Sequence, residues 1–402
     1  VELDGGLDEL LALAAVQRID QHLVLVGDVA APHLARAREL VVVRVELLVQ
    51  DEEAVDLRVG DFRLGGAELR EVGCRDRRGL LPAPEQGAAT LDSKRNRAVT
   101  DVVEPGSVMK PFTVAAALEA GLDPNIIVQT SPGWMMLGKY RISDVRDHGA
   151  VDLTHLLSTS SNIGAAKLGL EMTSEHLYDV LDRFGYGEST HSGFPGESSG
   201  VMAPPKTWGY VKRGSISYGM GLSVTPLQLA QSYAALANKG VLKPPTFLKG
   251  GQGEGRQAMD PKISRDVLGM LENVTLPGGT AQKAAILGYH VAGKTGTART
   301  ASGGGYTKKY VSVFAGVVPM DRPKFATVVV INNPRGRDYY GGLVSAPVFH
   351  NVMDGALRLM DVPPDNVQQW YAAAPGATLE APLEVPSEDE FVPDPVGLEA
   401  TP

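Results

Sequence analysis

The sequence holds one cysteine, Cys74, in 402 residues, which excludes an internal disulfide and any metal site built from several thiolates. Its eight histidines show no ligand spacing beside a carboxylate cluster, so we predict neither a metal nor another cofactor. No apolar run reaches the roughly eighteen residues that a membrane span requires. The best candidate, 40–49, is interrupted by Arg44 and Glu46. A signal-peptide pattern is also absent, and we expect the chain as given to be soluble and to carry no anchor.

Basic residues are in the minority, with 38 Lys and Arg against 47 Asp and Glu and a net charge of -9. This balance argues against a nucleic-acid partner. The hydrophobic fraction of 43% and the charged fraction of 21% are those of an ordinary globular protein. The length suits two domains, or one large domain with appendages.

The first 91 residues lack lysine, asparagine, serine, methionine, tyrosine and tryptophan altogether. Within them, 7–23 show some helical periodicity and 40–64 include alternating apolar positions typical of strands. We hypothesise that 1–91 are an atypical, non-native segment, such as an out-of-frame translation of a GC-rich gene. The alternative, weighed equally, is a genuine module of unusual composition. The remaining chain divides into a domain at 92–360 and a Pro-, Glu- and Asp-rich tail at 361–402, which is predicted to be disordered.

The most informative stretch, 104–112, indicates a loop that turns into a helix. Pro111 must lie in the first helical turn, where its missing N–H costs no hydrogen bond, so the helix begins near 105–107. Ser107 and Lys110 are then three residues apart on one helix face. A serine beside an amine that can take its proton fits an acyl-transfer nucleophile. Taken alone, Ser-x-x-Lys is a weak signal, and a solvated helix start is its more frequent meaning.

Beyond this helix the sequence predicts helices first and strands later. We expect a turn-rich region at 121–147, a helix hairpin at 152–170, and helices at 174–184, 225–238 and 260–273. Strands follow at 289–299, 310–318 and 323–332, and their short connections make them antiparallel neighbours. A closing helix is expected at 346–360.

Two further short motifs stand in this framework. Ser160-Ser161-Asn162 lies in the turn of the helix hairpin, and Lys294-Thr295-Gly296-Thr297 lies in the first late strand. Separately, each is most often a polar turn or an exposed strand. In this order, together with Ser107-x-x-Lys110, they form a specific combination.

These motifs resemble those of the transpeptidase domain of class B penicillin-binding proteins, the serine acyltransferases that cross-link bacterial peptidoglycan. The resemblance covers about 92–360, is supported by 95–101, 218–222, 225–230, 275–280 and 344–349, and is stronger to the septal cell-division type than to the elongation type. It implies a mixed α/β fold with an antiparallel central sheet covered by helices and an all-helical subdomain. Implied partners are peptidoglycan stem peptides, β-lactam antibiotics, a membrane glycan polymerase and division proteins. The implied location is the periplasmic face of the inner membrane.

The resemblance also implies a role for each catalytic residue. Ser107 would attack the penultimate D-Ala carbonyl of a stem peptide, with Lys110 as the base. Lys110 must be neutral for this, so its pKa must fall by roughly 3 units, or about 4 kcal/mol, through burial and the second cation Lys294. Ser160 would relay a proton to the leaving amine while Lys294 holds its hydroxyl. Asn162 would bind the peptide amide.

The late strand supplies the substrate-binding residues in this interpretation. Gly293 and Gly296 would leave room for an extended peptide to add to the strand. The hydroxyls of Thr295 and Thr297 would meet the terminal carboxylate. The N–H groups of Ser107 and Thr297 would hold the developing oxyanion.

One departure limits the resemblance. The family's Val-rich first strands are not recognisable in 1–91, so we expect the sheet to lack them and to expose an edge.

A β-lactamase would need a carboxylate base after the Ser-x-Asn turn, which is not evident around Glu171 or Glu188. A non-catalytic β-lactam sensor would need a transmembrane partner segment. A defunct, chimeric product is the remaining alternative.

Overall fold

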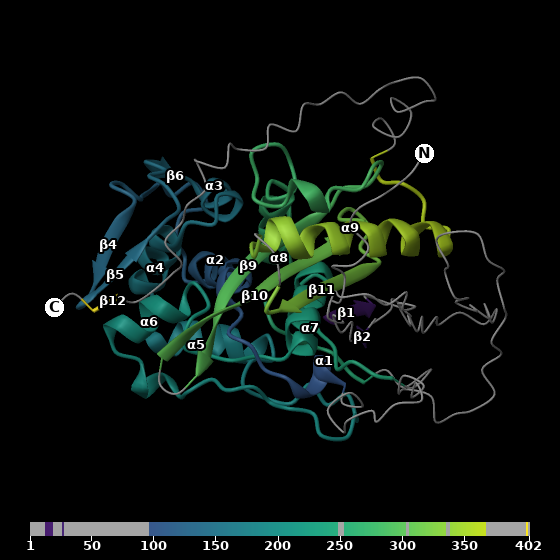
Figure 1. The fold of residues 1–402 in the computed structure, drawn as a ribbon, viewed down its shortest axis with the longest axis horizontal. Coiled ribbons are helices and arrows are strands. Elements are labelled where there is room, and N and C mark those ends of the chain that lie inside the picture. Colours follow the sequence, from purple (N-terminus) through teal and green to yellow (C-terminus); the bar gives the residue numbers. More distant parts are fainter. Residues whose placement is uncertain are drawn as a thin grey trace, which may run out of the picture.

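The computed structural model describes residues 96–247, 253–302, 305–334 and 338–366, and three short strands at 13–18, 26–27 and 399–400. In that part of the chain the helices are α1 (Arg97–Thr100), η3 (Gly106–Met109), α2 (Lys110–Glu119), α3 (Leu153–Ser158), α4 (Asn162–Glu171), α5 (Ser174–Arg183), η4 (Pro205–Thr207), α6 (Tyr210–Ile216), α7 (Pro226–Ala237), α8 (Pro261–Glu272), η5 (Gln282–Ala284) and α9 (Gly341–Leu359). The strands are β1 (Leu13–Arg18), β2 (Val26–Gly27), β3 (Val128–Gln129), β4 (Trp134–Leu137), β5 (Tyr140–Ser143), β6 (Ala150–Val151), β7 (Val241–Leu242), β8 (Arg256–Gln257), β9 (Ala292–Ser302), β10 (Gly305–Val318), β11 (Phe325–Asn332) and β12 (Glu399–Ala400). Figure 1 shows their arrangement.

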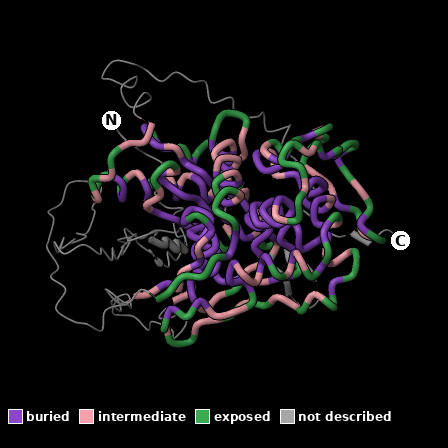
Figure 2. The backbone as a smooth tube through the Cα atoms, turned by 180° about the vertical axis from the view of Figure 1, so that it is seen from behind, coloured by how far each residue is buried: buried purple, intermediate pink, exposed green. Residues whose placement is uncertain are grey.

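A five-stranded antiparallel sheet, in the order β2-β1-β11-β10-β9, forms the centre of the fold. β11 is buried at every position except its last, because helices cover both faces. α9 packs on one face, where Phe349 meets Phe314 edge-on at 4.8 Å between ring centroids. α7 and η3 lie on the opposite face, where the Tyr233 hydroxyl donates to Val108 O at 2.9 Å. The buried positions accordingly concentrate in the middle of the molecule (Figure 2).

The predicted central helices are confirmed, and their caps explain where they begin. Thr225 caps α7 and forms a capping box with Gln228, and Pro226 occupies the first helical position. Asp260 caps α8 ahead of Pro261 without a capping box, and Thr173 caps α5. Each of these helix caps involves only a few consecutive residues, so the sequence alone predicts where these helices begin.

The second part of the fold contains α3, α4, α5 and α6 together with two small antiparallel ribbons, β3–β6 and β4–β5. The β4–β5 hairpin falls in the region expected to be turn-rich, and Gly138 at its tip has a φ of +64°. A short loop with a left-handed glycine matches the twist of the two strands it joins. The last residue of β5 leads directly toward the turn between α3 and α4.

Three expectations for the chain ends need correction. Residues 13–18 form β1 beside β11, so the helical periodicity noted over 7–23 does not produce a helix at these six residues, and the sheet does not end at β11. Backbone pairing with β11 overrides the weak local periodicity. The closing helix begins at Gly341, five residues earlier than expected, and runs through Pro347.

The predicted tail is also partly bonded to the sheet region. Val362 O accepts the Tyr289 hydroxyl at 2.6 Å, and Asn366 N–H donates to Gly288 O at 2.9 Å. The strands expected at 40–64, and the tail at 367–398, lie outside the described residues. The boundaries of the three segments therefore stay predictions. No helix in the described ranges is long and apolar enough to cross a membrane.

Candidate active site

Ser107 lies on η3, a 3-10 turn that continues directly into the buried helix α2. Gly106 adopts a φ of +57°, and its N–H donates to Gly219 O at 3.0 Å, which fixes the turn against a neighbouring loop. Val108 and Met109 are fully buried, whereas Ser107 is half-buried. The nucleophile candidate is thus rigidly held while its hydroxyl stays accessible.

Lys110 begins α2, one helical turn after Ser107, and is fully buried. Its amine donates to three acceptors of the α3–α4 turn: Ser160 O, Ser160 Oγ at 3.2 Å and Asn162 Oδ1 at 2.8 Å. The described residues show no hydrogen bond between Ser107 Oγ and the Lys110 amine. The turn therefore places the amine, which must release one of these contacts to accept the Ser107 proton.

Ser160 is the centre of the arrangement. Its Oγ accepts from Lys294 Nζ at 2.8 Å as well as from Lys110. Its backbone has a φ of +61°, a left-handed conformation that costs a non-glycine residue about 1–3 kcal/mol. Such strain persists only where the surroundings hold it, and here it brings one hydroxyl between two amines.

The two faces of β9 have different roles. Lys294 and Gly296 point to the face of η3, where a Cβ at Gly296 would lie 2.9 Å from Pro105 O. Thr297 points to the α9 face, where its Oγ1 accepts from Gly341 N at 3.1 Å. A Cβ at Gly293 would meet the Phe314 ring at 2.4 Å. Both glycines are therefore required by packing inside the protein, apart from any role in admitting a peptide.

Burial changes the proton affinity of both lysines. Loss of water lowers the pKa of Lys110 to about 7, and the carboxylate of Asp144 opposes that change. Burial and, next, the charge of Lys110 lower the pKa of Lys294 well below its ordinary value. The expected direction for Lys110 is confirmed. We expected the charge of Lys294 to lower the pKa of Lys110, but it is the charge of Lys110 that lowers the pKa of Lys294. The sequence did not point to the effect of Asp144.

The structure brings all eight predicted site residues into one region. Ser160, Lys110, Asn162 and Lys294 are joined by hydrogen bonds, and Gly106 lies close enough to β9 that a Cβ there would be 3.5 Å from Thr297 O. These contacts bring the late strand next to the nucleophile turn.

Sequence reasoning missed several residues that hold this site. Asp144 binds the Ser160–Asn162 turn, and Ser143 O accepts from Asn162 Nδ2 at 3.0 Å. Thr280 Oγ1 lies 3.0 Å from Thr295 Oγ1, and its N–H donates to Ser158 O at 3.2 Å. The only available signal was the 275–280 stretch, which supported the resemblance without a stated role. Asp144 is a single carboxylate in a loop, and nothing in its neighbours distinguishes it.

The carboxylates weighed for a hydrolase are occupied or exposed elsewhere. Glu188 forms an ion pair with Arg256, and Glu171 is exposed at the end of α4. Glu197, which the sequence analysis did not consider, accepts from Thr190 and Ser192. Within the described ranges, no group of three or more His, Cys, Asp or Glu side chains is arranged to hold a metal.

This fold and this site define a class of protein: the chain belongs to the penicillin-binding protein transpeptidase domain family, whose model matches residues 79–354. The chain is 43% identical over 283 residues to the probable peptidoglycan D,D-transpeptidase PbpC of Pseudomonas aeruginosa, covering 70% of this chain and 50% of that protein. It is 38% identical over 361 residues to the peptidoglycan D,D-transpeptidase FtsI of Escherichia coli K12, covering 87% of this chain and 61% of that protein. The chain thus spans half to three fifths of the length of these relatives.

Solved structures agree. The apo structure of the TP domain of Burkholderia pseudomallei penicillin-binding protein 3 matches with a TM-score of 0.65 and 40% identity, over 67% of this chain and 83% of that one. The chain is therefore a class B penicillin-binding protein of the FtsI-like type, with the expected mixed α/β transpeptidase fold.

Proposed function

We propose that this chain is a serine-type D-Ala-D-Ala transpeptidase that cross-links peptidoglycan stem peptides and is inhibited by β-lactams. The observation that carries the proposal is the contact of Ser160 Oγ with both buried lysine amines, beside the turn that presents Ser107. The family membership and the similarity to two peptidoglycan D,D-transpeptidases support it.

In the first step, neutral Lys110 takes the proton of Ser107 Oγ, which attacks the carbonyl carbon of the penultimate D-Ala. A pKa of about 7 leaves a large fraction of this amine neutral at physiological pH. The N–H groups of Ser107 and Thr297 hold the oxyanion, and losing one such donor costs roughly 2.7–4 kcal/mol in comparable enzymes. The C–N bond to the terminal D-Ala then breaks, and Ser160 passes a proton to the departing amine.

In the second step, the amine of another stem peptide attacks the acyl carbon. The ester bond to Ser107 breaks, the new amide is the cross-link, and the proton of the attacking amine returns to Ser107 through the same groups. Thr295 and Thr297 bind the terminal carboxylate of the donor, and Asn162 its amide. In the resting structure the Asn162 amide already contacts Lys110 and Ser143, so substrate binding must share or displace these bonds.

We extend the proposal to location and partners. Stem peptides lie at the periplasmic face of the inner membrane, which is where this domain would act. By family resemblance, a membrane glycan polymerase and division proteins are the expected partners, and the stronger resemblance of the sequence motifs to the septal type favours a role in cell division.

The test is labelling with a fluorescent penicillin, comparing the wild type with Ser107→Ala. We expect a stable label on the wild type, complete loss of label on Ser107→Ala, and D-Ala release from a stem-peptide donor only by the wild type. Ser131→Ala removes an exposed hydroxyl that binds Asp147 and should label normally. Rapid loss of label would point to a β-lactamase, slow loss without D-Ala release to a sensor, and an unlabelled soluble wild type to an inactive product.

A further inference from the structure

Asp144 directly follows β5, and its carboxylate reaches the turn that carries Ser160 and Asn162. Oδ1 accepts the backbone N–H of Asn162 at 2.6 Å and that of Ile163 at 3.1 Å, while Oδ2 accepts the Ser161 hydroxyl. The Asp144 N–H donates to Gly133 O at 3.0 Å, which anchors the residue on the hairpin side.

Asp144 adds a second acceptor to a helix start that already has a local N-cap. Ser161 is already the N-cap, because its Oγ accepts from Gly164 N at 2.9 Å. Asp144 satisfies two additional N–H groups and orients the capping hydroxyl as well. Ser143, the residue before it, accepts from the Asn162 side chain. Asp144 therefore binds the backbone of Asn162, and Ser143 binds the side chain of Asn162.

The turn that Asp144 binds, between α3 and α4, contains the strained backbone of Ser160. Ser160 has a left-handed backbone, and Lys110 contacts both its carbonyl and its hydroxyl. Without an external hold, relief of the strain would move Ser160 and Asn162 away from the amine. We propose that Asp144 is a positioning residue of the active site, whose carboxylate holds the 160–162 turn against Lys110 and supplies the negative charge that faces that amine.

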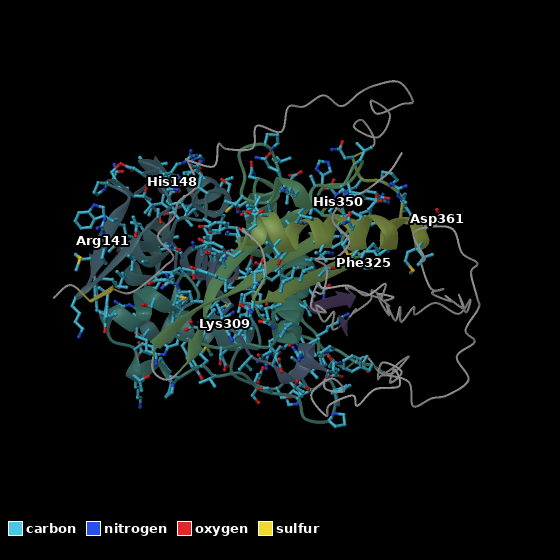
Figure 3. All side chains as sticks on the ribbon, in the orientation of Figure 1. Arg141, His148, Lys309, Phe325, His350 and Asp361 are labelled. Atoms are coloured by element: carbon cyan, nitrogen blue, oxygen red, sulfur yellow. The ribbon has the colours of Figure 1, made fainter. Side chains whose placement is uncertain are left out.

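The charged and titratable groups near the 160–162 turn come from two elements and a loop. Lys110 on α2 and Lys294 on β9 are the cations of the site, and Asp144 favours the protonated form of Lys110. His148 on the following loop is also influenced by Asp144, although burial lowers the pKa of His148. Figure 3 places His148 at the end of the molecule that carries β4 and β5. Because His148 is a second titratable group influenced by Asp144, the experiment must separate its effect from that of Lys110.

The proposal rests on the function proposed above, and Asp144→Asn tests it. Asparagine keeps an acceptor for the two N–H groups but removes the charge. We measure the second-order rate constant of acylation by a fluorescent penicillin between pH 5 and 9. The acid limb of the plot of this rate constant against pH should move to lower pH by about one unit, since the charge that favours protonated Lys110 is gone. The plateau should fall on the order of tenfold, since a charge-assisted hydrogen bond is lost.

Asp260→Asn is the matched control. Its Oδ1 accepts from the N–H groups of Lys262 and Ile263, at 2.7 and 3.3 Å, at the start of α8. Weakening a helix cap that has only a structural role should lower the stability of the protein without moving the acid limb. We therefore expect Asp260→Asn to leave the limb in place. His148→Gln should also leave the limb in place. A shift in His148→Gln as large as in Asp144→Asn would overturn the proposal.

An unmoved limb in folded Asp144→Asn overturns the proposal, whatever the plateau does. If that variant fails to fold, Asp144→Glu decides, because it keeps the charge and displaces the oxygens by one methylene. A lowered plateau with an unmoved limb then supports the proposal, and any other profile overturns it. Failure of the wild type to be acylated or to release D-Ala is a failure of the proposed function, and is seen before any variant is compared.

Discussion

Two fully buried amines share one hydroxyl oxygen in this site, and this couples their charge states. Lys110 and Lys294 both donate to Ser160 Oγ, so two ammonium groups would lie a few ångströms apart without water. Two like charges at such a separation cannot both persist cheaply, and each proton affinity depends on the other. The pKa of Lys110 near 7 makes it the group that changes its charge at physiological pH.

The pH dependence of acylation follows from Lys110. The rate constant should rise through a pH of about 7 and fall about tenfold per unit below it, because only the neutral amine accepts the Ser107 proton. Lys110→Arg, a permanent cation, should abolish acylation. Lys167→Arg changes a lysine that binds Gln129 O and should behave as the wild type. A flat profile from pH 5.5 to 8.5 would remove Lys110 from the role of base.

At the scale of elements, the site depends on how closely β9 approaches η3. A Cβ at Gly296 would lie 2.9 Å from Pro105 O and 3.1 Å from Val108 Cγ1, so only glycine allows this contact. On the other side, a Cβ at Gly341 would lie 2.6 Å from Gly296 O, which brings the start of α9 equally close. β9 is thus held between the nucleophile turn and the first turn of α9.

Gly296→Ala tests this approach. The added methyl should push β9 from η3 and lower the acylation rate constant on the order of 10²-fold, as expected for a displacement of about 1 Å. Gly269→Ala is the control, since that helical glycine on α8 has no atom within 4 Å of a Cβ position. It should leave acylation unchanged and raise the free energy of unfolding by about 0.5–1 kcal/mol. Equal acylation by both variants would contradict the packing argument.

At the scale of the whole molecule, the end of the described domain is hydrogen-bonded to the segment just before β9. Asp365 accepts from the backbone N–H of His290 at 2.8 Å, and the His290 ring forms an ion pair with Glu272 on α8. Burial lowers the pKa of His290, but the hydrogen bond and charge of Glu272 outweigh it, with Asp365 and Asp321 adding to the effect, and the pKa is raised overall. This link joins segments that are distant in sequence.

Stability should therefore depend on pH through His290. A pKa that is higher in the folded than in the unfolded protein adds stability below about pH 6.5, and this gain is lost as the pH rises through the folded value. Glu272→Gln should remove the gain, so that chemical unfolding at pH 6 and pH 8.5 differs less than in the wild type. His350→Gln changes a ring that contacts the Ala285 carbonyl and should keep the wild-type difference. An unchanged difference in Glu272→Gln would show that the pair does not contribute.

Much of this fold and site is readable from local signals. Pro111 and the Thr225–Pro226 pair mark helix starts, and the apolar run of β11 marks a strand covered on both faces. The helix through Pro347 was placed too late, because a proline is normally found in the first turn of a helix. β1 was missed because its pairing with β11 is a long-range contact that its own sequence does not encode.

The sequence by itself determined which chemical groups the protein has and on which elements they lie: Ser107 and Lys110 one turn apart, a polar turn at Ser160–Asn162, and a cationic strand at Lys294. Those choices depend on neighbours in the chain. Only the tertiary structure decided that both amines meet one hydroxyl, that burial lowers the pKa of Lys110, and that Asp144 faces it. Distances between residues far apart in sequence and loss of water both depend on the packed fold, so no local pattern reports them.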